Sequence, residues 1–94
     1  MRDDAFEWDE RKAALNLAKH GVSFAMARGA FRDVFAIEIL DDRENHSEER
    51  FNLIGNSEER LLFVTYAQRG DTIRLISARR AEPSERRRYH EGEF

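Results

Sequence analysis

The spacing of apolar residues changes about a third of the way along this chain, and that change limits the folds available to it. Up to residue 31 the apolar residues recur every three or four positions, as on one face of an α-helix. From residue 34 they gather in short β-branched and aromatic runs, separated by segments rich in Asp, Asn, Ser and Gly, which is typical of strands and turns. Helices followed by strands predict an α+β domain.

Two helices are predicted in the N-terminal part. The first runs from about Asp9 to His20, because Asp9 is a good N-cap and Gly21 offers the positive φ that a C-cap needs. Ser23 then caps a second helix of about Phe24 to Phe31. Because the two helices are joined at a glycine, we expect them to form a helical hairpin.

A sheet of about four antiparallel strands is predicted next. The strands are expected over Val34 to Leu40, Arg50 to Ile54, Leu61 to Tyr66 and Thr72 to Ala78. A tight turn at Arg69-Gly70-Asp71 makes the last two strands a hairpin. Phe6 to Trp8 can add a short strand at one edge.

A last helix is predicted from Pro83, which a first helical turn tolerates, to about Tyr89 or His90. We expect the helices to share one face of the sheet and to leave the other face open. At 94 residues the chain is long enough for one domain, residues 1–94, and too short for two.

Composition narrows the classes of function. The chain has no cysteine, and His20, His46 and His90 lie too far apart in sequence for a helical zinc pair, so we expect no metal and no cofactor. No apolar stretch approaches the roughly 20 residues that cross a bilayer, and the N-terminus lacks the apolar region of a signal peptide. These features predict a cytoplasmic protein with no membrane partner.

Charge is divided unevenly along the chain. The net charge is −3, yet residues 60–94 hold 8 Arg against 5 acidic residues. Arg makes up 14 of the 16 basic residues, and its planar guanidinium matches phosphate well. The skew favours anion recognition, although a GC-rich genome produces the same skew without a functional cause.

Several motifs resemble the BrnT family of bacterial toxins, and they follow one another in that family's order over almost the whole chain. They are Phe6-Glu7-Trp8-Asp9, Lys19-His20-Gly21-Val22-Ser23-Phe24, His46-Ser47-Glu48-Glu49-Arg50-Phe51, Arg69-Gly70-Asp71 and Ile73-Arg74-Leu75-Ile76-Ser77-Ala78-Arg79-Arg80. The individual matching positions are Phe6, Trp8, Asp9, Lys12, Asn16, Lys19, His20, Gly21, His46, Glu49, Arg50, Gly70, Arg74, Ser77, Arg79, Glu85 and Tyr89.

The resemblance implies a RelE-like fold and a ribonuclease toxin of a type II toxin-antitoxin system, which cuts RNA without metal and inhibits translation. It implies a partner as well, a ribbon-helix-helix antitoxin of the BrnA type, through which alone the toxin would reach operator DNA. The alternative is a non-catalytic binding module that complexes an antitoxin and co-regulates transcription.

RNA cleavage without metal needs a base for the 2′-hydroxyl proton, a cation at the phosphorane and an acid for the leaving oxygen. The catalytic candidates are Arg74, Arg79, Tyr89, His20 and Lys19, and the RNA-binding candidates are Arg80, Arg86, Arg87 and His46. Each has a plain structural alternative: an arginine paired to a neighbouring carboxylate, a histidine that stabilises a helix end, or an aromatic ring that packs on the sheet.

The last strand gives the clearest geometric expectation. Strict alternation places Arg74, Ile76, Ala78 and Arg80 on one face and Ile73, Leu75, Ser77 and Arg79 on the other. Ile73 and Leu75 are the better core pair, which leaves Arg74 on the open face.

Overall fold

The computed structural model describes residues 5–41 and 49–92, and it confirms the α+β class. In chain order the elements are β1 (Phe6–Glu7), α1 (Glu10–His20), α2 (Phe24–Ala30), β2 (Ile37–Asp41), β3 (Arg50–Ser57), β4 (Arg60–Arg69), β5 (Thr72–Arg80) and α3 (Pro83–Glu91). The predicted caps are confirmed: the Asp9 carboxylate accepts hydrogen bonds from the amides of Arg11 and Lys12, and the Ser23 hydroxyl accepts one from the amide of Met26. Within these residues no helix is long and apolar enough to cross a membrane.

The sheet has five strands in the order β1-β5-β4-β3-β2, where four antiparallel strands were expected. β2 to β5 form an antiparallel meander, but β1 runs parallel to β5, so the sheet is mixed. The expected edge strand at Phe6 is therefore present. Most of the chain separates β1 from β5, so no hairpin turn forces these two strands to be antiparallel.

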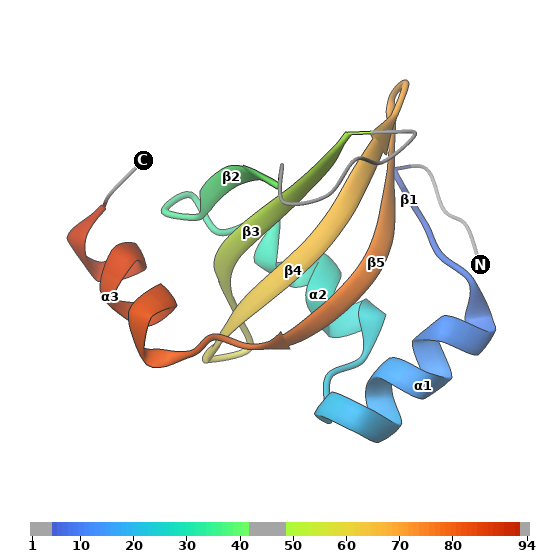
Figure 1. Ribbon diagram of the computed structural model, residues 1–94, viewed down its shortest axis with the longest axis horizontal. Coiled ribbons are helices and arrows are strands. Elements are labelled where there is room, and N and C mark those ends of the chain that lie inside the picture. Colours follow the sequence, from blue (N-terminus) through green and yellow to red (C-terminus); the bar gives the residue numbers. More distant parts are fainter. Residues whose placement is uncertain (1–4, 42–48, 93–94) are drawn as a thin grey trace.

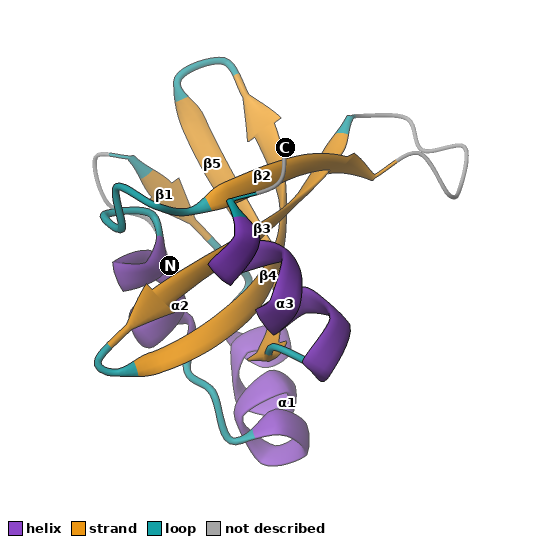
Figure 2. Ribbon diagram, turned by 90° about the vertical axis from the view of Figure 1, so that its left-hand side faces the viewer, coloured by secondary structure: helices purple, strands orange, loops and turns teal. Residues whose placement is uncertain are grey.

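The helices cover both faces of the sheet, which corrects the expectation that they share one. α1 packs against β5 and α2 against β3, β4 and β5, whereas α3 contacts β3 from the opposite side (Figure 1, Figure 2). α1 and α2 pack mainly on the sheet and little on each other, so the expected helical hairpin is wrong in its contacts. The open face carries its own apolar residues, Ile37 and Ile54, which are buried and give α3 a surface to cover.

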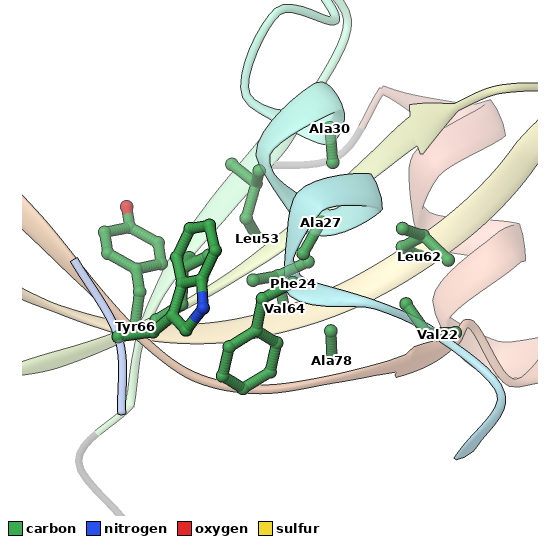
Figure 3. Close-up of a cluster of buried hydrophobic side chains, with 11 residues drawn as sticks. Val22, Phe24, Ala27, Ala30, Leu53, Leu62, Val64, Tyr66 and Ala78 are labelled. Atoms are coloured by element: carbon green, nitrogen blue, oxygen red, sulfur yellow. The ribbon is translucent and has the colours of Figure 1, made fainter. Parts of the chain in front are cut away.

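The core lies between α2 and the sheet (Figure 3). Phe24 and Ala27 of α2 pack on side chains of β3, β4 and β5, and the ring of Tyr66 packs edge-to-face on Phe31. A Cβ at Gly55 would lie 2.7 Å from the Ala30 carbonyl oxygen, so this strand position needs glycine for α2 to approach β3 closely.

Beyond β1, the outer edge of β5 is completed by a side chain of α1. The Asn16 amide donates hydrogen bonds to the carbonyl oxygens of Ala78 (2.8 Å) and Val22 (2.9 Å) and accepts one from the Ala78 amide (3.1 Å). It thus bonds to both backbone groups of Ala78, as a neighbouring strand would. The buried Asn16 side chain therefore joins α1, the segment between α1 and α2, and β5.

A bulge between β4 and β5 changes the expected alternation of the last strand. Tyr66 pairs with Leu75 but Thr65 pairs with Ser77, so one residue of β5 is passed over. As a result Ala78 faces the core together with Leu75, and Arg79 moves to the α3 face, opposite to the predicted assignment. Arg74 lies on the α3 face as predicted, because it precedes the bulge.

Candidate functional site

Arg79 holds α3 against the sheet. Its guanidinium donates two hydrogen bonds to the Glu85 carboxylate, at 2.9 and 2.8 Å, and lies 4.3 Å from the centre of the Phe63 ring. Glu85 is the third residue of α3 and also accepts a hydrogen bond from the Glu82 amide, which completes a capping box. The same carboxylate therefore fixes both the start of the helix and its attachment to β5.

A second attachment joins the other end of α3 to the loop after α2. The Tyr89 hydroxyl donates a 2.6 Å hydrogen bond to the Asp33 carboxylate, which also accepts hydrogen bonds from the amides of Asn56 (2.8 Å) and Phe35 (2.9 Å). Burial alone would raise the pKa of Asp33, but these three donors outweigh it and lower that pKa. Burial and the Asp33 hydrogen bond raise the pKa of the Tyr89 phenol to about 12.

Held in this way, α3 forms one wall of a cleft whose other wall is the turn between β3 and β4. The cleft has a volume of about 420 Å³. Its lining residues are Asn56, Glu59, Arg60, Leu61, Arg80, Arg86, Tyr89 and His90. Figure 1 shows the β3–β4 turn and the start of α3 at the same end of the sheet.

Positive charge converges in this cleft from three elements. Arg60 comes from the start of β4, Arg80 from the end of β5 and Arg86 from α3, against the single acidic residue Glu59. Within the described part of the chain the guanidinium groups of Arg80 and Arg86 make no hydrogen bond or ion pair. They are thus available to an anionic ligand, and phosphate is a natural one.

The turn that faces α3 has an uncommon backbone. Its two central residues, Glu58 and Glu59, have φ angles of 50° and 65°, a region that glycine and asparagine occupy at lower cost. Both central residues of a type I′ hairpin turn have positive φ, so the strand pairing requires this shape. The chain nevertheless places two carboxylates there, and Glu59 lines the cleft.

Three of the predicted site residues meet in the cleft: Arg80, Arg86 and Tyr89. The others lie elsewhere. Lys19 and His20 end α1, Arg74 lies 3.6 Å from the Glu7 carboxylate, Arg79 is bound to Glu85, and the exposed Arg87 does not line the cleft. His46 lies outside the described residues.

The sequence did not identify Arg60, Glu59 and His90 as residues that would line the same cleft. His90 could have been found, because Arg86, Tyr89 and His90 stand at positions i, i+3 and i+4 of one helix and so share a face. The β4 start and the β3–β4 turn carried no such signal, since their proximity to α3 follows from the position of α3 on the sheet.

We expect the attachment of α3 to weaken in acid. The pKa values of Asp33 and Glu85 are lowered from their usual 3.8 and 4.5 in the folded protein, despite burial, by hydrogen bonds from Tyr89 and Arg79 in particular. Both carboxylates therefore stabilise the fold above these usual values, and this contribution is lost as the pH falls through the lowered pKa values.

Tyr89→Phe tests this dependence, because it removes one hydrogen bond to Asp33 and keeps the ring. It should lower the free energy of unfolding by about 1 kcal/mol near neutral pH, and the difference from the parent should shrink as Asp33 becomes protonated. Urea unfolding of both proteins across the acid range measures the difference. A difference that stays constant with pH would contradict the role of this hydrogen bond.

The comparison with known families identifies the family of the chain. Residues 8–85 match the family described as the ribonuclease toxin BrnT of type II toxin-antitoxin systems. No individual curated protein matches the chain. The match covers most of the chain, from Trp8 before α1 to Glu85 in α3, and so includes every strand after β1. This protein therefore belongs to the BrnT family of ribonuclease toxins of type II toxin-antitoxin systems.

Proposed function

We propose that this toxin binds RNA in the cleft between α3 and the β3–β4 turn and cuts it there without a metal ion. The observation that carries the proposal is the convergence of Arg80 and Arg86, neither engaged by another described residue, with His90 and Glu59 in one cleft. RNA cleavage begins with attack of the 2′-oxygen on the neighbouring phosphate. This reaction requires cations at the phosphate and two groups that can exchange a proton, and the cleft offers both.

In this proposal each cleft residue has one role. Arg80 and Arg86 stabilise the negative charge that grows on the phosphorane. Glu59 takes the 2′-hydroxyl proton and His90 gives one to the leaving 5′-oxygen, because a carboxylate can accept a proton and an imidazolium can donate one. The products would be a 2′,3′-cyclic phosphate and a free 5′-hydroxyl.

Tyr89 is proposed to hold the substrate and not to transfer the proton. Its phenol already donates to Asp33, and its raised pKa of about 12 makes it a weaker acid than an ordinary tyrosine. Its ring lines the cleft and can stack on a base, which favours single-stranded RNA in general. Arg79 acts through Glu85 by positioning α3, and so Arg86 and His90.

Type II systems pair a toxin with an antitoxin, and we propose a BrnA-like ribbon-helix-helix protein as the partner here. The complex would form in the cytoplasm and reach operator DNA through the antitoxin, and the free toxin would inhibit translation by cutting RNA. An apolar surface beside the cleft supports a partner there. Val34 is 87% exposed and Phe35 is 74% exposed, and both line a pocket together with Tyr89 and His90.

Phe35→Glu is expected to weaken the complex with the antitoxin at least tenfold, because a charge would replace an aromatic side chain that the partner covers. RNA cleavage is checked in Phe35→Ala, which places no charge beside His90 and should stay within about twofold of the parent, since Phe35 does not line the cleft. Co-purification and titration calorimetry with the antitoxin measure the first effect. Unchanged affinity would show that the antitoxin binds elsewhere.

The proposed activity is tested by incubating purified toxin with RNA in excess EDTA and analysing the new ends. Cleavage with cyclic phosphate and 5′-hydroxyl products supports it. Cleavage that stops on chelation would contradict metal independence, and no cleavage under any condition would favour the alternative of a non-catalytic binding module.

A further inference from the structure

A second pocket adjoins the cleft on the far side of the β3–β4 turn. It has a volume of about 500 Å³ and lies between α2 and that turn. Its lining residues are Ala25, Arg28, Gly29, Arg32, Asp33, Asn56, Ser57 and Glu58. Nothing in the proposed cleavage chemistry uses it.

Asn56 separates the two pockets and lines both. Its amide is fixed by a 2.8 Å hydrogen bond to Asp33, the residue that also holds Tyr89. Its side chain is exposed and makes no hydrogen bond to the described residues, so both its donor and its acceptor face solvent. A ridge of this kind suits a nucleotide that passes from one pocket to the next, because an Asn amide can meet the edge of an unstacked base.

The lining of the second pocket holds two arginines and two acidic residues, and one of the arginines can bind a phosphate. Arg28 is held 5.5 Å from the Phe6 ring centre, whereas Arg32 is exposed and its guanidinium has no partner among the described residues. Of the two acidic groups, Asp33 already accepts three hydrogen bonds, and Glu58 stands exposed at the tip of the turn. Arg32 is therefore the basic group left to meet an incoming anion.

We propose that the second pocket is a subsite for single-stranded RNA, in which Arg32 binds the phosphate next to the scissile one while Asn56 contacts the intervening base. The proposal rests on the proposed function, since it extends the same RNA strand beyond the cleft. It predicts that a short oligonucleotide fills the cleft alone and that a longer one gains affinity from Arg32.

The test measures binding of two uncleavable probes, 2′-O-methyl oligouridylates of about two and about six nucleotides, to the full-length protein. Arg32→Ala should weaken binding of the longer probe by up to about fivefold, the upper range for an exposed ion pair. It should also reduce the dependence of log K on log salt by about 0.7, the value for one phosphate contact on a single strand. Binding of the shorter probe should not change.

Three further variants separate the possible outcomes. Arg32→Lys should recover most of the affinity, and Arg11→Ala, an exposed arginine of α1 that lines neither pocket, should bind both probes like the parent. Arg86→Ala should weaken both probes. If Arg32→Ala leaves the longer probe unaffected, or weakens both probes equally, the subsite is refuted. If Arg86→Ala affects neither probe, the proposal that RNA binds in the cleft is refuted. The subsite is still judged by the effect of Arg32→Ala on the longer probe.

Discussion

Arg86→Ala and Arg80→Ala should each slow RNA cleavage by about 10²- to 10³-fold, the usual cost of removing one preorganised donor from a developing oxyanion. Both guanidinium groups line the cleft, and neither is engaged by another described residue, so their charge is directed at the ligand and not at the fold. Stability should change by no more than about 0.5 kcal/mol, because both side chains are exposed. Single-turnover cleavage and urea unfolding of the same preparations measure the two effects.

The chain supplies a matched control on the same helix. Arg87 is the next residue, is also exposed, and does not line the cleft. Arg87→Ala should therefore cleave within about threefold of the parent, a change expected of a distant surface charge. Equal loss in Arg86→Ala and Arg87→Ala would mean that the helix contributes only diffuse positive charge, and the assigned role of Arg86 would be wrong.

Asn16→Ala should lower the free energy of unfolding by about 3 kcal/mol, which is among the largest effects of any single substitution here. The change leaves the amide and carbonyl of Ala78 and the carbonyl of Val22 without their Asn16 hydrogen bonds in a buried region. The higher helix propensity of Ala offsets only about 0.5 kcal/mol of this loss in the free energy of unfolding. The midpoint of thermal unfolding should fall by more than about 10 °C.

Asn16→Asp and Lys12→Ala separate the hydrogen bonds from general effects on α1. The aspartate keeps the size of the side chain but places a carboxylate against two carbonyl oxygens, so it should be as damaging as alanine. Lys12 is exposed on the same helix, and its replacement should cost less than about 0.5 kcal/mol. A loss below about 1 kcal/mol in Asn16→Ala would show that water or backbone movement replaces these hydrogen bonds.

Features fixed by neighbouring residues were predictable from the sequence. The ends of α1 follow from Asp9 and Gly21, and the start of α2 from Ser23, because a cap is formed within one helical turn. The β4–β5 hairpin follows from Gly70 in the same way. The position of α3 was not predictable, since it depends on Arg79 meeting Glu85 and on Tyr89 meeting Asp33, a residue far away in the sequence.

The bulge shows why the candidate site could be predicted only in part. Alternation is reliable only while two strands stay in register, and one skipped residue after Leu75 transfers Arg79 to the other face. The sequence pointed to the arginine-rich last strand and last helix, and the structure brings Arg80, Arg86 and Tyr89 of these elements together in one cleft. Which arginines are engaged by carboxylates became visible only when the fold had brought Glu7 and Glu85 beside Arg74 and Arg79.

The location of the RNA site is the central claim, and NMR titration of the labelled protein with an uncleavable 2′-O-methyl oligouridylate tests it most directly. The largest shifts of backbone amide signals should occur at the residues that line the cleft, Arg60, Arg80, Arg86 and His90 above all. Signals of Arg74 and Lys19 should move little. Shifts centred on Arg74 and Glu7, or on the end of α1 at Lys19 and His20, with the cleft unaffected, would contradict the account.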